Sequence, residues 1–289
     1  MLEMLCALPT PCGGEEIAKK YIMQKFPQFK EDKIGNLVAR YPGEGKTVML
    51  YAALDEDAAV VMDVQEGKKV FFAHLGKRKV YPGMQVSFGG YTGFVCADGE
   101  NPEENQYILM TETAEGLQAG RNGVFEGNFE GETDSPDNVL LGKNIAARAA
   151  ISAFLSDFES DFNVYIVLGV QSNHGNKGLS AAAKEIRADR VLIFEETKGE
   201  KMTVKSLASG YAASNAAESE LCSAFEKAGI SHEISADSGE KSAGAAAPWG
   251  STGVIGIPVL FPDFMRQGIR VKTAEEIQKF VKTYLENRE

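Results

Sequence analysis

The sequence predicts a layered α/β domain that carries a small all-β module inserted into it. In the first and last parts of the chain, strand-like apolar runs alternate with amphipathic helices, which favours helices packed on the faces of a sheet. Between about residues 63 and 140 the pattern changes to short β-type runs punctuated by Gly, Pro and Asn. We therefore expect a discontinuous three-layer α/β domain at 1–62 and 140–289, and a barrel-like β domain at 63–139.

The first part of the chain starts the alternation of helix and strand. Residues 15–26 (EEIAKKYIMQKF) place apolar side chains on one helical face and two Glu in the first turn, which predicts a helix. A strand is expected within 33–43 (KIGNLVARYPG). The stretch 47–64 (TVMLYAALDEDAAVVMDV) then predicts a central strand that is interrupted by an acidic cluster at 55–57.

The predicted β module consists of short runs that are rich in β-branched and aromatic residues. Its strands are expected in KKVFFAHL (68–75), MQVSFGGYTGFVCA (84–97), QYILMTET (106–113) and NGVFEGNF (122–129). Strand–helix alternation then returns, which predicts the second part of the α/β domain. The elements expected there are NIAARAAISAFLSDFES (144–160), VYIVLGV (164–170), LSAAAKEIRA (179–188), RVLIFEE (190–196), SNAAESELCSAFEKAGI (214–230), TGVIGIPVLF (252–261) and TAEEIQKFVKTYLE (273–286).

The composition excludes several classes of protein. Of the 289 residues, 44% are hydrophobic, enough for a substantial core, and the net charge of −11 makes nucleic acid or an anionic membrane a poor electrostatic partner. No apolar stretch is long enough to span a bilayer. The N-terminal MLEMLCALPTPCGG lacks the pattern of a signal peptide, and the four cysteines form no CxxC pair. A cytoplasmic protein with free thiols is therefore expected.

A polar turn follows one of the predicted strands. In 164–178 (VYIVLGVQSNHGNKG), the apolar run ends in Gln171, Ser172, Asn173 and His174. Ligands of open α/β sheets usually lie at the carboxyl ends of the strands, so these residues are expected at a site. Serine and asparagine are neither strong metal ligands nor strong bases, which makes their presence there informative.

Several stretches, in this order along the chain, resemble the family of glutamyl and tetrahedral aminopeptidases. LPTPCGGEE resembles that family's Pro-x-x-Ser-Gly-x-Glu segment, KIGNLVAR its Leu-Gly-Asn-Leu strand and YAALDEDAAVVMDV its Ala-His-Met-Asp-Glu strand. LGKNIAARAA is similar to the Lys-Ala-Leu-Asp-Asn-Arg helix start, VQSNHGNKG to the Gln-Glu-Glu-Val-Gly turn and TGVIGIPV to the closing Ile-Pro strand. The resemblance implies an aminopeptidase scaffold with two divalent metal ions (zinc or cobalt), an inserted dimerisation domain and dimers built into larger tetrahedral shells.

At most positions where the resemblance implies a metal ligand or a base, this chain carries another type of residue. The general base falls on Ser172 and a neighbouring ligand on Asn173, where the family has two Glu. The first His ligand falls on Ala53 and the bridging Asp on Ala146, so that Ala53, Ala146 and Asn173 are interpreted as lost ligand positions. The residual candidates for metal binding are Asp55, Glu195, Asp263 and His174.

These substitutions decide which chemistry is expected. Two neighbouring divalent ions need a bridging anion and several donors to offset their repulsion, and alanine supplies neither. Peptide hydrolysis needs a base that takes a proton from the attacking water, which neither Ser172 nor Asn173 does at neutral pH. No catalytic residue and no cofactor are therefore assigned. A lone oxygen-rich site for magnesium, calcium or manganese is the alternative, built from Asp55, Glu56, Asp57, Glu195, Glu196 and Asp263.

Three functions remain open at this point. The favoured one is a catalytically inactive pseudo-peptidase that binds a peptide or small molecule in the old substrate cleft or acts as a scaffold. The second is an active metal-dependent aminopeptidase with a rewired metal site, in which His174 is a replacement ligand rather than a solvent-facing loop residue. The third is a structural subunit that assembles with an active paralogue. A homo-oligomer, or a hetero-oligomer with such a paralogue, is expected.

Overall fold

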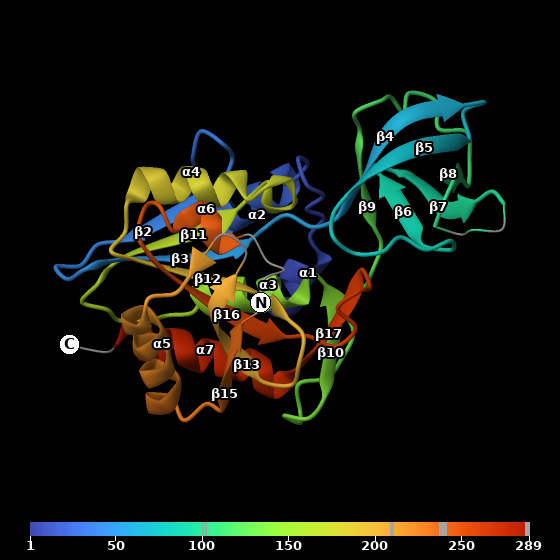
Figure 1. Cartoon of the computed structure of the whole chain (residues 1–289). Coiled ribbons are helices and arrows are strands. Elements are labelled where there is room, and N and C mark those ends of the chain that lie inside the picture. The colour runs from blue at the N-terminus through green and yellow to red at the C-terminus, as the bar shows by residue number, and fades with distance from the viewer. Residues whose placement is uncertain (100, 102, 209–210, 237–241, 287–289) are drawn as a thin grey trace.

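The structure is a computed structural model that describes the chain except for residues 100, 102, 209–210, 237–241 and 287–289. It confirms the layered α/β domain with an inserted β-barrel (Figure 1). Among the described residues, no helix is both long enough and apolar enough to cross a membrane.

A central sheet runs through the α/β domain. Its strands lie in the order β1 (Lys30–Glu31), β2 (Leu37–Tyr41), β11 (Asn163–Gly169), β3 (Thr47–Ala53), β12 (Arg190–Thr197), β16 (Ser251–Pro258), β13 (Met202–Ala208) and β14 (Tyr211–Ala212), with β15 (His232–Ala236) beside β13. The strands β11, β3, β12 and β16 are parallel. Because helices cover both of their faces, these strands are nearly continuous apolar runs.

Helices form the outer two layers. One face of the sheet is covered by α3 (Ile145–Phe154), α5 (Asn215–Lys227) and α7 (Val271–Leu285), and the other by α4 (Lys177–Ile186) and α6 (Ser242–Ala246). The helix α1 (Leu2–Ala7) packs on α3, and α2 (Glu16–Lys25) adds Ile22 to the same hydrophobic cluster. Side chains of β3 alternate between the layers, with Leu50 facing α3 and Met49 facing α4.

The inserted module is a closed barrel. Its strands follow the order β4 (Ala58–Gln65), β5 (Lys69–Leu75), β8 (Gln106–Met110), β7 (Tyr91–Ala97), β6 (Gln85–Phe88) and β9 (Asn122–Phe125). Alternate residues of these strands fill the interior, among them Val61, Val70, Val86, Val95 and Ile108. Closure leaves no open sheet edge, so a module with little helix remains well paired.

The structure corrects the predicted start of the inserted domain. The stretch 47–64 is not one interrupted central strand: β3 ends at Ala53, and β4 begins at Ala58 and lies in the barrel. The predicted boundary between residues 62 and 63 therefore falls inside β4. The acidic cluster at 55–57 is the reason, because its buried side chains and backbone are bound at the sheet edge and turn the chain away from the sheet.

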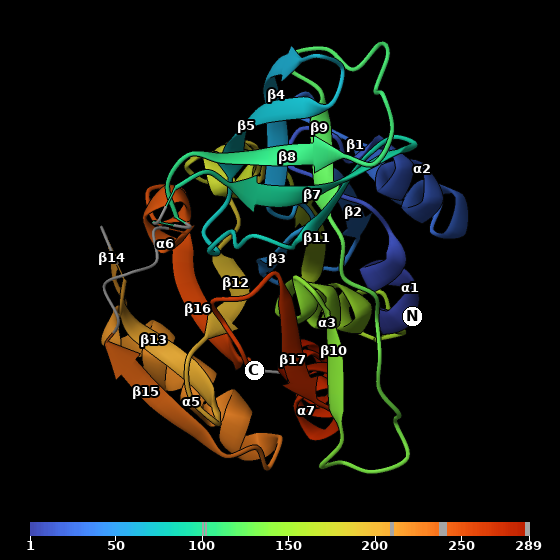
Figure 2. The ribbon, with the colours of Figure 1, turned by 90° about the vertical axis from the view of Figure 1, so that its right-hand side faces the viewer.

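The other end of the insertion returns to the α/β domain through β10 (Val139–Lys143). This strand pairs antiparallel with β17 (Arg266–Arg270), beside α3 and α7 (Figure 2). Residue 139, which the prediction assigned to the β domain, thus belongs to this pair. The barrel and the sheet meet where β3 leads into β4, and that junction positions the candidate site.

Candidate functional site

The site lies where β3 ends, at the carboxyl edge of the sheet. The Leu54 N–H donates a hydrogen bond to the carbonyl of Gly169 at the end of neighbouring β11 (2.6 Å). The next residues, Asp55, Glu56 and Asp57, have exposed fractions of 1%, 5% and 4%. Burial of an unpaired charge is costly, so each of these carboxylates requires a partner. The partners that they have define the chemistry of the site.

Glu56 joins the N-terminal loop to this acidic segment. The Cys12 N–H donates to the Glu56 carbonyl (3.1 Å), and the Glu56 N–H donates to the Thr10 carbonyl (2.8 Å). The Thr10 N–H donates in turn to the Glu56 carboxylate (2.9 Å), which lies 3.3 Å from the Lys143 ammonium. This carboxylate therefore has a structural role, and the loop that it holds brings Cys12 next to Asp55.

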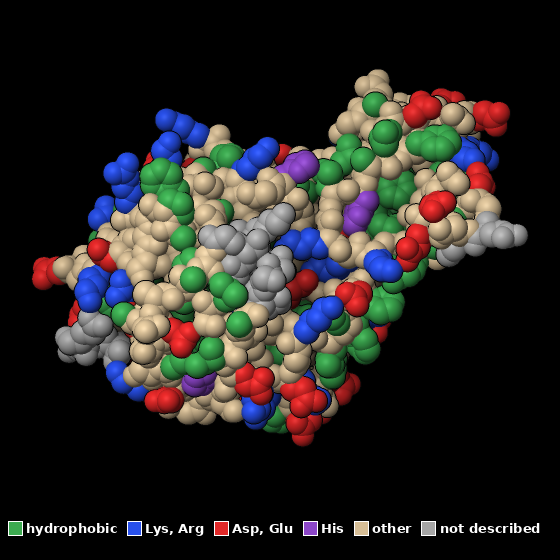
Figure 3. All heavy atoms as spheres, in the orientation of Figure 1, with side chains coloured by type: hydrophobic (Ala, Val, Ile, Leu, Met, Phe, Trp, Pro, Cys, Tyr) green, Lys and Arg blue, Asp and Glu red, His purple; other side chains and the backbone are tan. Residues whose placement is uncertain are grey.

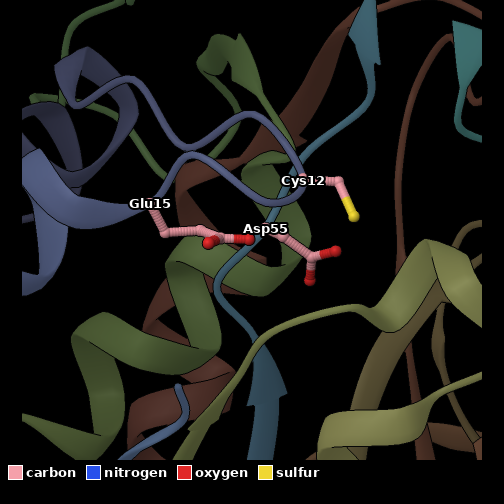
Figure 4. Close-up of side chains that lie close together, drawn as sticks. All are labelled: Cys12, Glu15 and Asp55. Atoms are coloured by element: carbon pink, nitrogen blue, oxygen red, sulfur yellow. The ribbon is translucent and has the colours of Figure 1, made fainter. Parts of the chain in front are cut away.

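Three ligand-type side chains consequently meet beside β3. The Cys12 thiol and the carboxylates of Glu15 and Asp55 are buried, and a potential ligand atom of each lies within 4.8 Å of the others. They come from the loop before α2 and from the segment after β3, and they lie close together (Figure 4). Burial raises the pKa of Cys12, and the Asp55 charge raises it further. Burial also raises the pKa of Glu15 and of Asp55.

The turn after β11 faces the same carboxylate. Gln171 adopts a left-handed backbone conformation (φ 55°) and leads into the short 3₁₀ turn η1 (Ser172–His174). The backbone N–H of Ser172 donates to both oxygens of Asp55 (2.9 and 3.2 Å). At the predicted position of the general base, this chain therefore supplies a hydrogen-bond donor that fixes an acidic group.

Arg78 connects the barrel to the sheet. It lies between β5 and β6, and its guanidinium donates to Asp57 (3.0 Å), to Glu196 (2.6 Å) and to Gln267 (3.1 Å). Burial alone would raise the pKa of Asp57, but the hydrogen bond from His74 and the charge of Arg78 hold it below its usual value. Basic and acidic side chains accordingly lie beside each other where the barrel meets the α/β domain (Figure 3).

A second internal cation neutralises Glu195 at the end of β12. Lys205 on β13 is 1% exposed, and its ammonium donates to one oxygen of Glu195 (2.8 Å). The hydroxyl of Ser242, at the start of α6, donates to the other oxygen. Both oxygens of the Glu195 carboxylate therefore already accept a hydrogen bond, one from an ammonium group and the other from a hydroxyl.

A small polar cavity of about 70 Å³ lies between these groups. It is lined by Tyr51, Ala53, Asp55, Lys77, Arg78, Asn144, Ala147, Ser172, Asn173, Asn176, Ile193, Phe194, Glu195, Glu196 and Ser242. A cavity of this size admits a few water molecules or one small polar ligand. The hydroxyl of Tyr51 is fully buried and has no hydrogen-bond partner among the residues that the structure describes.

The structure brings together two of the four predicted metal-binding candidates. Asp55 and Glu195 both line the cavity. Asp263 lies on an exposed loop after β16, where its carboxylate is 3.9 Å from the Lys198 ammonium and 65% exposed. His174 is exposed at the end of η1. The predicted set is therefore not a single site, because two of its members face solvent.

The predicted lost positions lie close to the cavity. Ala53 lines it, whereas Ala146 is buried in the hydrophobic cluster between the sheet and α3. The next residue, Ala147, is the one on α3 that lines the cavity, because successive helical residues point about 100° apart. Neither the methyl group of Ala53 nor that of Ala147 has a lone pair that could bind a metal ion. Arg148, the arginine of the family's motif, donates to the Leu54 carbonyl (2.8 Å) and to the Thr10 hydroxyl.

Of three comparisons with known proteins, two found relatives of this chain. No protein-family model matches the chain. A curated protein of Acetivibrio thermocellus, described as "Putative aminopeptidase", is 24% identical over 216 residues, which cover 68% of this chain and 65% of that protein. The match thus spans less than two thirds of that relative's length.

Solved structures extend the likeness to almost the whole chain. Aminopeptidase APDkam598 from the archaeon Desulfurococcus kamchatkensis has a TM-score of 0.86 at 18% identity, over 99% of this chain and 93% of that one. The chain has the fold of the tetrahedral aminopeptidases. The TET1 peptidase of Pyrococcus horikoshii, which is described as assembling into a tetrahedron or a large octahedral shell, has a TM-score of 0.84 at 19% identity, over 99% and 98%. The resemblance inferred from the sequence is confirmed at the level of the aminopeptidase fold.

Proposed function

We propose that this chain is a catalytically silent protein on the aminopeptidase fold, which binds a small ligand or serves as a scaffold. One observation supports this most: basic side chains of the chain itself neutralise the carboxylates at the sheet edge. Lys205 is bound to Glu195, and Arg78 is bound to Asp57 and Glu196. These carboxylates are thereby occupied by cations that cannot dissociate.

The donor set does not fit the pair of divalent ions that the family implies. Two such ions repel each other and need a bridging carboxylate between them, whereas Ala53 and Ala147 line this cavity. The ammonium of Lys205 would also lie close to any ion held by Glu195. We therefore derive no catalytic step that depends on a metal pair.

A base for peptide hydrolysis is also missing from the position where the family has one. Ser172 occupies it, and a serine hydroxyl does not accept a proton at neutral pH. Of the acidic residues nearby, Asp55 accepts hydrogen bonds from the turn and Glu195 from Lys205 and Ser242. The cavity volume of about 70 Å³ favours a small polar ligand over a peptide.

A peptidase assay tests the proposal. The purified chain is incubated with a panel of aminoacyl-p-nitroanilides and with added zinc, cobalt or manganese, beside an active aminopeptidase as the positive control. We expect no release of nitroaniline above a heat-treated sample. Metal-dependent turnover that is lost in Glu195→Gln would overturn the proposal, because it would require a working site at this carboxylate.

A specific observation keeps an active enzyme with a rewired metal site as the second candidate. The buried group of Cys12, Glu15 and Asp55 offers ligand atoms at metal-binding separation. This set differs from the predicted one, since it shares only Asp55 with it. Turnover that survives Glu195→Gln but is lost in Glu15→Gln would support this candidate over the silent protein.

The scaffold role rests on assembly. We propose that the chain forms a homo-oligomer, with assembly on an active paralogue as the alternative, because solved structures of this fold include a dodecamer and shells. Light scattering on the purified chain, and mass spectrometry of the proteins that co-purify with it at native abundance, separate the two. A cytoplasmic location stays a prediction.

A further inference from the structure

The carboxylates of the site differ in how their charge is compensated. Glu56, Asp57, Glu195 and Glu196 each have a basic side chain within 3.3 Å. Within the part of the chain that the structure describes, Asp55 and Glu15 have no such partner: the groups that hydrogen-bond to their carboxylates are backbone N–H groups and neutral side chains, which carry no full charge. Lys19, one turn after Glu15, pairs with Glu31 instead (2.7 Å).

These two carboxylates are also close to a thiol. The backbone N–H groups of Gly13 and Ser172 fix the carboxylates of Glu15 (2.8 Å) and Asp55 (2.9 Å), and the Glu56 backbone fixes the loop that carries Cys12. The three ligand atoms converge within 4.8 Å although they come from two separate segments (Figure 4). Their positions are therefore held by the fold before anything binds.

A further buried polar group without a partner lies in the cavity that Asp55 lines. The Tyr51 hydroxyl is fully buried and makes no hydrogen bond to any described residue. It lines the cavity that Asp55 also lines, so Asp55 is common to the cluster and the cavity. A buried hydroxyl without a partner is destabilising, and a polar ligand next to Asp55 would relieve this cost.

We propose that Cys12, Glu15 and Asp55 bind a single zinc ion. One sulfur and two carboxylate oxygens are a donor set that zinc accepts, and three protein ligands leave a fourth position open. Binding requires the thiolate, so the Cys12 proton is released to solvent when the ion binds. The ion then supplies the positive charge that Lys205 and Arg78 supply elsewhere in the site.

This zinc site is independent of the proposed silent function. It uses the N-terminal loop, not the ends of β11 and β12, and it contains one ion instead of a pair. Bound zinc without peptide turnover would leave both proposals standing. Bound zinc with turnover that requires Glu15 would support the site and overturn the silent function, whereas absence of zinc would overturn only the site.

Metal titration of the full chain tests the site. Protein stripped with a chelator is incubated with zinc, dialysed, and analysed for zinc per chain by mass spectrometry of the elements. We expect about one zinc per chain, and at least a tenfold loss of affinity in Cys12→Ser and in Glu15→Gln. Cys222→Ser on α5 is the matched control and should retain the full amount.

Cobalt provides a second readout that does not depend on affinity. A cobalt–thiolate bond gives a charge-transfer absorption, which we expect in the wild type and in Cys222→Ser but not in Cys12→Ser. Far-UV circular dichroism verifies that each variant is folded. If Cys12→Ser does not fold, Asp55→Asn replaces it in the zinc titration. No stoichiometric zinc, or a cobalt–thiolate band that persists without Cys12, would overturn the proposal.

Discussion

Lys205 is the residue whose role differs most from what its sequence context indicates. It lies within MTVKSLA, where a lysine on a strand usually faces solvent, yet it is 1% exposed and bound to Glu195. Only the fold brings β13 within reach of the end of β12. A buried pair is weak evidence for stability as such, but the loss of one partner leaves the other charge buried and uncompensated.

We predict that Lys205→Met lowers the free energy of unfolding by about 3 kcal/mol, because one oxygen of the Glu195 carboxylate loses the Lys205 ammonium. Urea denaturation at neutral pH measures the change. The double variant Lys205→Met with Glu195→Leu should recover most of the loss, since both charges are removed together. A loss below about 1 kcal/mol for the single variant would mean that the Lys205–Glu195 pair contributes little to stability.

At the scale of the element, the segment between β5 and β6 wraps around a carboxylate. The N–H groups of Lys77 and Arg78 donate to Asp57 (3.1 and 3.0 Å), and the guanidinium of Arg78 adds an ion pair. Gly76 makes this approach possible, because a Cβ there would lie 2.2 Å from the Asp57 carboxylate. The barrel thereby contributes directly to the charge balance of the sheet edge.

The lowered pKa of Asp57 has a consequence for stability in acid. A carboxylate whose pKa is lower in the folded chain than in the unfolded one stabilises the fold above the unfolded-state pKa of about 4. That contribution is lost as the pH falls through the folded-state pKa. We expect Arg78→Met to lower stability at pH 7 and to weaken the further loss on acidification, measured as urea midpoints from pH 7 to pH 3.

Arg190→Met is the control for this experiment, because Arg190 pairs with Glu220 on α5, away from the barrel. It should keep the acid dependence of the wild type. If Arg78→Met kept it as well, the hydrogen bond from His74 and the backbone donors, not the guanidinium, would hold the pKa of Asp57 down.

The periodicity of the sequence was enough to predict the layers and the barrel, but not the point at which the chain passes from one to the other. AAVVMDV at 58–64 is equally compatible with a strand of the central sheet and a strand of the barrel. The hydrophobic pattern of a strand indicates which side chains are buried, but not which strand it pairs with. The site was predicted where family motifs exist, at Asp55, Ser172 and Glu195. Arg78 and Cys12 were missed because their contacts join residues far apart in the chain, and Lys205 because only the pairing of the strands brings it to the end of β12.

At the scale of the whole molecule, the outer wall of the barrel carries exposed apolar side chains. Phe94 on β7 and Leu109 on β8 are cross-strand neighbours that are 42% and 47% exposed, and Met62 on β4 is 63% exposed. Large apolar side chains at a monomer surface often mark an interaction site. They agree with the predicted role of the barrel in self-association, which no other observation on this chain tests.

We predict that Phe94→Glu combined with Leu109→Lys shifts the molar mass toward that of the monomer, 31.2 kDa, in light scattering. Opposite charges at paired positions keep the strands compatible while they remove the apolar contact. Phe261→Ser, which alters an exposed aromatic in the α/β domain, should leave the mass unchanged. An oligomer that persists in the double variant would place the interface elsewhere.

The pairing of β4 with β9 brings the entry and exit of the barrel next to each other, with Ala58 opposite Val124. A segment whose two ends lie side by side can be lost or gained in evolution as one unit without distorting the domain into which it is inserted. In this chain such an excision would have an electrostatic penalty as well, because Glu196 would lose its only ion pair among the described residues. The barrel and the altered sheet edge are therefore expected to be inherited together.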